Sequence, residues 1–312
     1  MTSAIRTRNL ERRFGRTKAL DGIDLDVPEG AVYAVVGANG AGKTTLIKVL
    51  MNIIHPSSGM AETLGMDVLK LSGKAFQQIG YVSENQEMPE WMTTRQMLAY
   101  YRNFYPRWDR GLEEHLLRQF DLPLDRKLKH LSRGMRMKAS FVSSHAYSPS
   151  LIVLDEPFSG LDPLVRDELI EVLIERAPES TIFLSSHDLA EIESVSSHVG
   201  YLENGRLLFS EEMAVLIDRF REVTVTVNGP ASTPDRLPES WLQVEAADSV
   251  VRFVHSRFSG GTPSEVAEYF PSLRDIRFDP MSLRAIFLAM AKSSRVSSKS
   301  APIVDVAKEV EA

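Results

Sequence analysis

A glycine-rich stretch between an apolar run and a helical run constrains this chain more than any other feature. Residues 31–36 read AVYAVV, a β-rich apolar run suited to a buried parallel strand. Residues 37–45 follow as GANGAGKTT, which fits G-x-x-x-x-G-K-[ST], and residues 46–50 (LIKVL) have helical spacing. Glycines let a backbone bend around phosphate groups while its N–H groups point inward. The strand before and the helix after favour a nucleoside triphosphate site over a chance glycine-rich turn.

Two side chains of this loop have predicted roles in holding the nucleotide. Lys43 would reach the β- and γ-phosphates, and the hydroxyl of Thr44 would coordinate Mg²⁺. The predicted nucleotide-binding residues of the loop are Gly37, Asn39, Gly40, Ala41, Gly42, Lys43, Thr44 and Thr45.

A second apolar run, LIVLDEP at 151–157, ends in two acidic residues. Asp155 falls at the carboxyl end of the predicted strand, beside the phosphate loop in a P-loop fold, where it would hold Mg²⁺ through water. Glu156 is placed to polarise an attacking water and is the predicted general base. Two acids could also form a solvated turn, but the phosphate loop favours the catalytic interpretation.

A third apolar run, TIFLSSHD at 181–188, brings a histidine to the same sheet edge. A lone histidine is more often structural than catalytic. His187 is the exception among the seven histidines, because its place at the end of a buried strand would let it contact the γ-phosphate and sense its presence.

Residues 131–140 read LSRGMRMKAS and predict a second anion-binding helix end. Ser132 is a plausible N-cap, and the helix after it would begin with free backbone N–H groups. The loop at 37–45, LSRGM, LIVLDEP, SGLDP and SSH occur in this order at the usual separations. Over about residues 4–210 the chain therefore resembles the ATPase subunit of an ABC transporter, an α/β P-loop NTPase with a mixed sheet core and a helical subdomain.

The resemblance implies a dimer that binds ATP and Mg²⁺. In this family two nucleotide domains pair head to tail, so Ser132 and Gly134 of one chain would cover the γ-phosphate held by the loop of the other. A complete set of motifs in one chain makes a homodimer sufficient, while a heterodimer with a second ABC ATPase subunit stays open. The resemblance also implies separate membrane-spanning permease subunits.

Two further site residues are carried over from the family pattern. RRFGRTKAL at 12–20 matches the segment whose aromatic side chain stacks on adenine, which places Phe14 there. IGYVSENQEM at 79–88 matches the Q-loop, but Glu84 stands where glutamine is usual; it is kept as a catalytic and Mg²⁺-approaching residue. The signature also departs from the pattern, with Arg133 in place of glycine and Met135 in place of glutamine.

The helical subdomain is predicted at about residues 85–145, where the resemblance implies that a coupling helix of the permease docks. Residues 112–120 (LEEHLLRQF) have helical spacing. Trp91, Tyr105 and Trp108 could form a partner surface or pack the subdomain core, and the sequence does not decide between these. The FYPRWD stretch also resembles ATPases of ABC-2 type exporters.

The remaining sequence predicts an accessory domain and a tail. With the ATPase domain at residues 1–213, residues 214–292 are predicted to be a small α+β domain, including a strand with Val223, Val225 and Val227 on one side. It could bind a regulatory ligand, but a packing or dimerisation module is favoured because no chemical motif lies in it. Residues 293–312 are polar, and disorder is predicted for them.

Composition excludes several alternatives. A net charge of −6 argues against nucleic acid as the main partner, and the absence of cysteine excludes thiolate chemistry. No stretch approaches the length of a membrane span. The resemblance, which implies membrane-spanning partner subunits, gives the expected location: peripheral, at the cytoplasmic face of the cell membrane. The favoured function is the ATP-hydrolysing motor of an ABC exporter. The alternatives are a soluble ABC ATPase acting on ribosomes or DNA, and an importer subunit.

Overall fold

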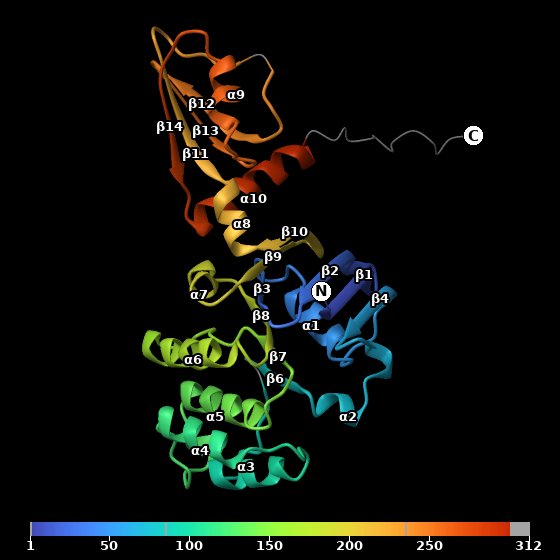
Figure 1. The fold of residues 1–312 in the computed structure, drawn as a ribbon. Helices are drawn as coiled ribbons and strands as arrows, with labels where there is room; N and C mark the ends of the chain where they lie inside the picture. The colour runs from blue at the N-terminus through green and yellow to red at the C-terminus, as the bar shows by residue number, and fades with distance from the viewer. Residues whose placement is uncertain (1, 85, 235, 300–312) are drawn as a thin grey trace, which may run out of the picture. The chain divides into compact units, whose positions relative to one another are not determined.

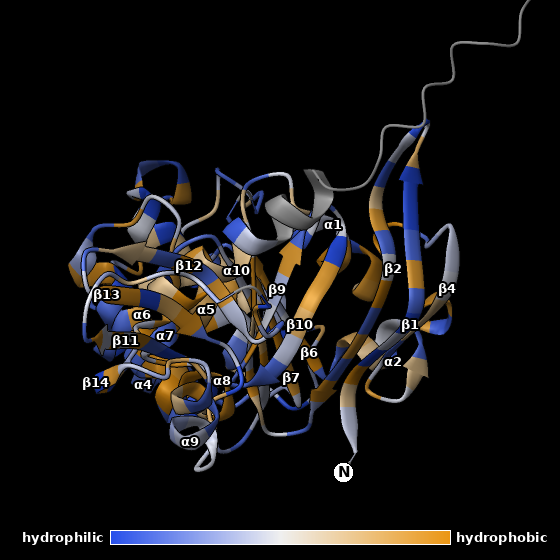
Figure 2. Ribbon diagram, turned by 90° about the horizontal axis from the view of Figure 1, so that it is seen from above, coloured by the Kyte–Doolittle hydropathy of each residue, from blue (hydrophilic) through white to orange (hydrophobic). Residues whose placement is uncertain are grey.

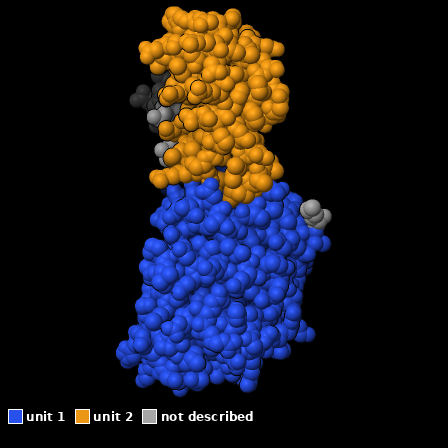
Figure 3. Space-filling view, turned by 60° about the vertical axis from the view of Figure 1, so that its left-hand side comes forward, with its two compact units in different colours: residues 1–212 blue, residues 213–312 orange. Residues whose placement is uncertain are grey.

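The computed structural model describes residues 2–84, 86–234 and 236–299, and the chain divides into two compact units (Figures 1 and 3). Residues 1–212 form the first unit and residues 213–312 the second. Each unit contains a buried hydrophobic cluster of its own.

A six-stranded sheet forms the centre of the first unit. Its strand order is β10-β9-β3-β8-β7-β6, and all neighbours are parallel except β10 and β9. Every residue of β3, β7 and β8 is buried, as expected for parallel strands covered on both faces. The strands are β3 (Val32–Val36), β6 (Ile79–Ser83), β7 (Leu151–Asp155), β8 (Thr181–Ser186), β9 (His198–Glu203) and β10 (Arg206–Glu212).

An antiparallel sheet, in the order β2-β1-β4-β5, forms a second layer of this unit. Helix α1 (Lys43–Leu50) lies between the two sheets and contacts β2, β4 and β7 (Figure 1). Its buried face joins both sheets in one hydrophobic core. Strand β1, which lies between β2 and β4 in this sheet, carries hydrophilic stretches in Figure 2. The strands are β1 (Ser3–Phe14), β2 (Thr17–Pro28), β4 (Ser58–Thr63) and β5 (Met66–Asp67).

Several of the remaining helices of the first unit pack around helix α5. Helix α5 packs on β6 and contacts α3, α4 and α6. Polar residues cap these helices: Thr93 forms a capping box with Gln96, and Ser132 accepts a hydrogen bond from the backbone of Met135, as its sequence position predicted. The helices are α2 (Gly73–Phe76), α3 (Thr94–Arg102), α4 (Arg110–Gln119), α5 (Arg133–His145), α6 (Pro163–Arg176) and α7 (Leu189–Glu193), with 3-10 turns η1 (Val68–Lys70) and η2 (Leu128–His130).

The second unit is an antiparallel sheet in the order β12-β13-β11-β14 with helices. Val223, Val225 and Val227 are buried on one face of β11, as their alternation predicted, beside a stack of Trp241 on Phe253. The elements are α8 (Met213–Arg219), β11 (Arg221–Val227), β12 (Trp241–Ala247), β13 (Val250–His255), α9 (Thr262–Glu268), β14 (Leu273–Pro280) and α10 (Leu283–Lys299).

Three details of this part differ from the sequence expectations. The sequence of residues 211–220 (EEMAVLIDRF) predicts one helix, but residues 211–212 pair with β9 as the end of β10, and α8 begins at Met213. Strand β14 was not predicted, since its alternation of charged and apolar residues is broken. Residues 293–299, for which disorder was predicted, continue helix α10, and residues 300–312 lie outside the described residues.

Candidate nucleotide site

The loop between β3 and α1 has the backbone that a phosphate cradle requires. Gly42 precedes the helix with φ of 113°, a left-handed conformation that residues with a side chain rarely adopt. No side chain caps this helix start, so its first N–H groups are left for another acceptor. A Cβ atom on Gly37 would lie 2.1 Å from the carbonyl oxygen of Leu202. The loop therefore keeps its glycines for steric reasons as well as for phosphate approach.

Lys43 is buried at this loop and directs its ammonium group across it. Its Nζ atom donates to the carbonyl oxygens of Gly37 at 2.7 Å and Ala38 at 3.3 Å. The same atom lies 3.0 Å from Oε1 of Glu156. A buried cation surrounded by backbone oxygens and one carboxylate fits the chemistry of an anionic phosphate.

Asp155 ends β7 and is buried between two hydroxyl groups. Its Oδ1 atom accepts hydrogen bonds from Thr44 at 3.0 Å and from Ser185 at 2.8 Å. Burial raises the pKa of Asp155, and the two hydroxyl donors partly offset that effect.

These oxygen atoms fit Mg²⁺, which is usually held by one or two carboxylates together with substrate phosphates and water. Among the residues that the structure describes, no group of three or more histidines, cysteines or acids could hold a metal ion alone. One hydroxyl and one carboxylate, the donor set of Thr44 and Asp155, suit a Mg²⁺ ion that arrives with the phosphates of its nucleotide.

Glu156 connects the loop lysine to the histidine after β8. Its Oε2 atom shares a hydrogen bond of 2.7 Å with Nδ1 of His187, while Oε1 faces Lys43. Its backbone has φ of 52°, a strained conformation for a residue with a side chain, and its N–H donates to Ser185 at 2.9 Å. The structure thus brings together Lys43, Glu156 and His187, three residues that the sequence placed at one sheet edge.

The signature residues lie elsewhere in the unit. Ser132 uses its hydroxyl to cap α5, and Gly134 packs against Val165 of α6, where a Cβ atom would lie 3.2 Å from both methyl groups. A cavity of about 230 Å³ beside the loop is lined by Thr44, Lys48, Tyr81, Ser83, Glu84, Asp155 and Glu156. Ser132 and Gly134 are not among the residues that line it.

Phe14 ends β1 with its side chain exposed, and the guanidinium carbon of Arg12 lies 4.6 Å from its ring centroid. The following strand β2 reaches the phosphate loop: a Cβ atom on Gly42 would lie 2.6 Å from the carbonyl oxygen of Ala19. The hairpin that carries Phe14 is therefore anchored beside the loop through its second strand.

Glu84 follows β6, and its backbone fixes it at the sheet edge where Asp155 ends β7. Its N–H donates to the carbonyl oxygen of Asp155 at 3.0 Å. Its side chain forms an ion pair with Arg133 at 2.5 Å and accepts a hydrogen bond from Ser159 at 3.1 Å. The sequence singled out Glu84 and Arg133 separately, as departures from the family pattern, but not as partners. It also missed Ser185, which stands in the SSH motif directly before Ser186 and His187.

The aromatic residues near the helical subdomain have mixed roles. Tyr105 stacks on Tyr147 at a centroid distance of 3.8 Å, and Trp108 donates to Glu113 at 2.6 Å. Trp91 is 67% exposed, so it does not pack the subdomain core. Tyr105 and Trp108 therefore pack partly on side chains of the subdomain, and Tyr105 also lines a cavity beside it, whereas Trp91 is exposed.

Comparison with known proteins agrees with this geometry. The family model described as ABC transporter matches residues 20–159. A daunorubicin resistance ATP-binding protein, DrrA2, of Streptomyces coeruleorubidus is 31% identical over 255 residues, covering 76% of this chain and 79% of the relative. The bacitracin transport ATP-binding protein BcrA of Bacillus licheniformis is 32% identical over 212 residues, covering 67% of this chain and 69% of the relative. The chain belongs to the ABC transporter family.

Among solved structures, an ATP-binding subunit of an ABC transporter matches this ABC ATPase with a TM-score of 0.64 and 28% identity. The match covers 70% of this chain and 92% of that chain. The predicted fold class, a P-loop NTPase of the ABC type, is confirmed, and the protein is a nucleotide-binding ATPase of this family. Within the described ranges, no helix is both long and apolar enough to cross a membrane.

Proposed function

We propose that this ABC ATPase powers export through separate membrane-spanning subunits, as a homodimer at the cytoplasmic face of the membrane. The observation that carries the proposal is the chain of contacts from Lys43 through Glu156 to His187, beside Asp155 and Thr44. Export is supported by the relatives, whose names refer to drug resistance and bacitracin transport.

In the proposed reaction, Lys43 exchanges a carboxylate for the phosphates of ATP. The ammonium group that now lies 3.0 Å from Glu156 turns to the β- and γ-phosphates, and the carboxylate is released toward solvent water. Glu156 then accepts the proton of the attacking water, and His187 fixes the orientation of the carboxylate through their 2.7 Å hydrogen bond. Phe14 offers an exposed ring face for stacking on the adenine.

Thr44 and Asp155 would hold Mg²⁺ in this site, and their hydrogen bond already places both oxygens at the cavity. The bound ion supplies charge neutralisation at the phosphate oxygens. Glu84 lines the same cavity and is the third proposed oxygen ligand.

The dimer proposal follows from where the signature lies. Ser132 and Gly134 are outside the cavity that the phosphate loop lines, yet Ser132 begins a helix of 13 residues whose N–H groups favour an anion. A second copy facing the first would let this helix end meet the γ-phosphate of its partner. The binding of two ATP molecules at such an interface would stabilise the closed dimer, and hydrolysis would reopen it.

The helical subdomain and the core of the first unit together form a groove that suits a helix of a membrane subunit. A cavity of about 460 Å³ is lined by residues from the turn after α1, from α2, β6 and α3, from the loops after β6 and α3, and from the end of α5 and the turn after it. Its walls are mainly aromatic and aliphatic: Met51, Ile53, Phe76, Ile79, Tyr81, Tyr101, Tyr105 and Tyr147. Ile53 is 54% exposed, although it is a large apolar residue, which favours a partner on this surface.

The function is tested by capture of the partner from native membranes. Tagged full-length Glu156→Gln is incubated with ATP and detergent-solubilised membranes, and bound proteins are identified by mass spectrometry. The proposal expects a multi-spanning membrane protein among the bound proteins. Adding Ile53→Asp should abolish its capture. Adding Ile174→Asp, which changes an exposed residue of α6 outside the groove, should leave its capture unchanged. Ribosomal or DNA-bound proteins in the eluate would instead support a soluble ABC ATPase, and a solute-binding import complex would overturn export.

A further inference from the structure

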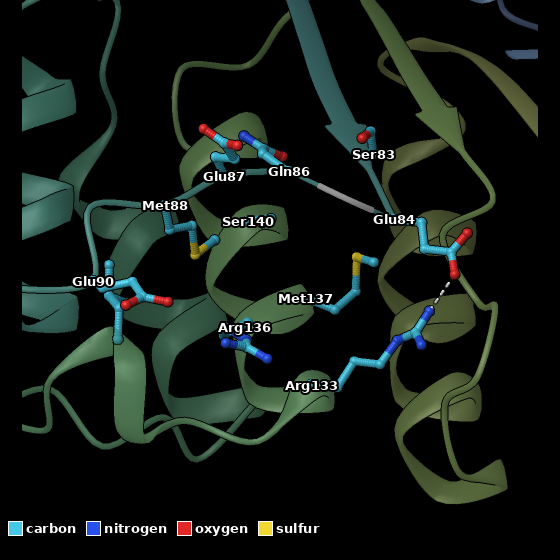
Figure 4. Close-up of a pocket in the computed structure, with 11 residues that line it drawn as sticks. Ser83, Glu84, Gln86, Glu87, Met88, Glu90, Arg133, Arg136, Met137 and Ser140 are labelled. Carbon is cyan, nitrogen blue, oxygen red and sulfur yellow. Dashed lines mark hydrogen bonds and ion pairs between the residues drawn. The ribbon is translucent and has the colours of Figure 1, made fainter.

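Two positions that depart from the family pattern contact each other in this chain. Glu84 stands where glutamine is usual and Arg133 where glycine is usual, and their side chains form an ion pair at 2.5 Å. Figure 4 shows the pair at one wall of a cavity of about 560 Å³ between the segment after β6 and helix α5. These two departures from the family pattern therefore form a single ion pair, which connects the Q-loop position to the signature helix α5.

Arg133 is held in place from more than one side. It is the first residue of α5, directly after the cap residue Ser132. Its guanidinium lies over Gly160, since a Cβ atom there would lie 2.8 Å from Nη1. Ser159 donates to the same carboxylate oxygen of Glu84 that Arg133 contacts. The pair thus joins three segments: the loop after β6, the start of α5 and the loop after β7.

Glu84 can serve two cavities without moving its backbone. Its N–H is fixed to the carbonyl oxygen of Asp155, and its side chain lines both the cavity of Arg133 and the cavity of Thr44 and Asp155. Rotation about its side-chain bonds moves the carboxylate from one cavity toward the other. In the present geometry the carboxylate faces Arg133 and Ser159.

We propose that Arg133 is a positioning residue that holds the Glu84 carboxylate away from the metal site, so that Mg²⁺ and Arg133 compete for one carboxylate. The inference rests on the proposed function of the Thr44–Asp155 site. The side chains of Arg133 and Glu84 are 45% and 31% exposed, and ion pairs of this exposure are weak enough for a divalent cation to displace. A fully buried pair would hold the carboxylate too tightly for such an exchange.

The exchange also links the two sites of the proposed dimer. When Glu84 turns to the metal, the guanidinium of Arg133 loses its partner at the start of α5, on the helix end that carries Ser132 and Gly134. That helix end faces the phosphates held by the other copy. Metal binding in one subunit therefore adds a free cation at the signature that completes the site of its partner.

The experiment measures metal affinity without hydrolysis. The full-length protein is saturated with a non-hydrolysable ATP analogue, and Mn²⁺ replaces Mg²⁺ as the probe. The concentration of free Mn²⁺ is measured by electron paramagnetic resonance. The variants are Arg133→Met, which removes the charge at similar length, and the same change in a Glu84→Gln background. Arg136→Met is the matched control, because Arg136 lines the same cavity and makes no ion pair with any described residue. Arg133→Lys tests rescue by charge alone.

Arg133→Met is expected to tighten Mn²⁺ binding about two- to fivefold, the range for an exposed ion pair. In the Glu84→Gln background the same change is expected to have no effect, since the two residues act through one contact. Arg136→Met is expected to match the unaltered protein, and Arg133→Lys to lie closer to it than Arg133→Met. Thermal melting of each variant confirms folding.

An unchanged Mn²⁺ affinity in Arg133→Met overturns the inference, and so does an equal shift in both Glu84 backgrounds or in Arg136→Met. These results leave the proposed function standing as long as the unaltered protein binds Mn²⁺ with the analogue. Failure of the unaltered protein to bind Mn²⁺ at all would overturn both the inference and the proposed metal site.

Discussion

The inner part of the nucleotide site and its rim are built differently. In the inner part, Lys43 and Glu156 have side chains only 5% and 13% exposed, and Asp155 is buried between two hydroxyl groups. At the rim, Phe14 is 49% exposed, and the Glu84–Arg133 pair is solvent-accessible. Inner contacts are held by strand ends and by a loop with fixed backbone angles, whereas the rim contacts depend on the orientation of long side chains.

This difference predicts which substitutions have large effects on catalysis and which have small ones. Breaking a buried, paired charge leaves its partner unpaired in a low-dielectric place, which costs far more than breaking an exposed pair. Substitutions in the inner part should therefore change catalysis by orders of magnitude, and substitutions at the rim by small factors. The following predictions test that order.

The largest effect is expected from Glu156→Gln. Loss of the general base should lower the rate of phosphate release by about 10²- to 10⁴-fold. Nucleotide binding should persist or tighten, because the carboxylate that pairs with Lys43 is gone. Glu175→Gln, at an exposed position of α6, is the control. Turnover within tenfold of the unaltered protein would show that Glu156 is not the general base. It would also contradict the expected difference in catalytic effect between the inner part and the rim.

Asp155→Asn should separate activity from stability. Hydrolysis should fall by about 100-fold when this group is lost, the upper end of the range of about 10- to 100-fold for mutations around a metal site. The free energy of unfolding should rise by about 1 kcal/mol at neutral pH, because a buried charge is removed while both hydroxyl donors keep an acceptor.

The pH dependence of that stability gain has a defined sign. Burial raises the pKa of Asp155 above its ordinary value of 3.8, so the folded state binds the proton more tightly than the unfolded state. The unaltered protein thus loses stability as the pH rises through the raised value. The advantage of Asp155→Asn should be full at neutral pH and should disappear below pH 3.8, as measured by denaturant unfolding at several pH values. An advantage independent of pH would contradict the burial argument; Asp167→Asn, at an exposed position, serves as the control.

A smaller effect is expected from His187→Ala. His187 is exposed but shares its hydrogen bond with a residue of the inner part, so it tests the border between the two regions. Turnover should fall about tenfold, as for loss of one hydrogen bond to a charged group, while the melting temperature stays unchanged. His187→Gln should recover part of the rate. A loss as large as that of Glu156→Gln would place His187 in the inner part.

The smallest effect is expected at the rim from Phe14→Ala. Loss of one stacking face should raise the KM for ATP about two- to tenfold and leave kcat unchanged. Phe14→Tyr keeps the face and should behave like the unaltered protein. A KM that does not change would show that the ring does not contact the adenine, and a fall in kcat would contradict its assignment to the rim.

The inner part could be predicted from sequence because backbone geometry dictates it. A loop of fixed length joins β3 to α1, and Asp155, Glu156 and His187 stand at or directly after the ends of neighbouring parallel strands, which meet at one sheet edge. The positive φ of Glu156 was not predictable, since no residue type in its vicinity requires it.

For the rim, the sequence predicted which residues belong to it but not which of them contact one another. Nothing in the spacing of Glu84 and Arg133, which are 49 residues apart, indicates that they meet, because the approach depends on how α5 packs on β6. The same reason explains Trp91: its exposure is decided by packing of the subdomain and not by local pattern. In the second unit, the alternating valines of β11 were readable, while β14 pairs along an irregular pattern and was missed.

The most direct test of the account is the mass of Glu156→Gln in solution with and without ATP and Mg²⁺, measured by light scattering. The account predicts that the mass rises from the 34.9 kDa of one chain to twice that value when ATP is added, and that Lys43→Ala in the same background abolishes the rise. A mass that stays at one chain under saturating ATP would contradict the claim that a second copy completes the site.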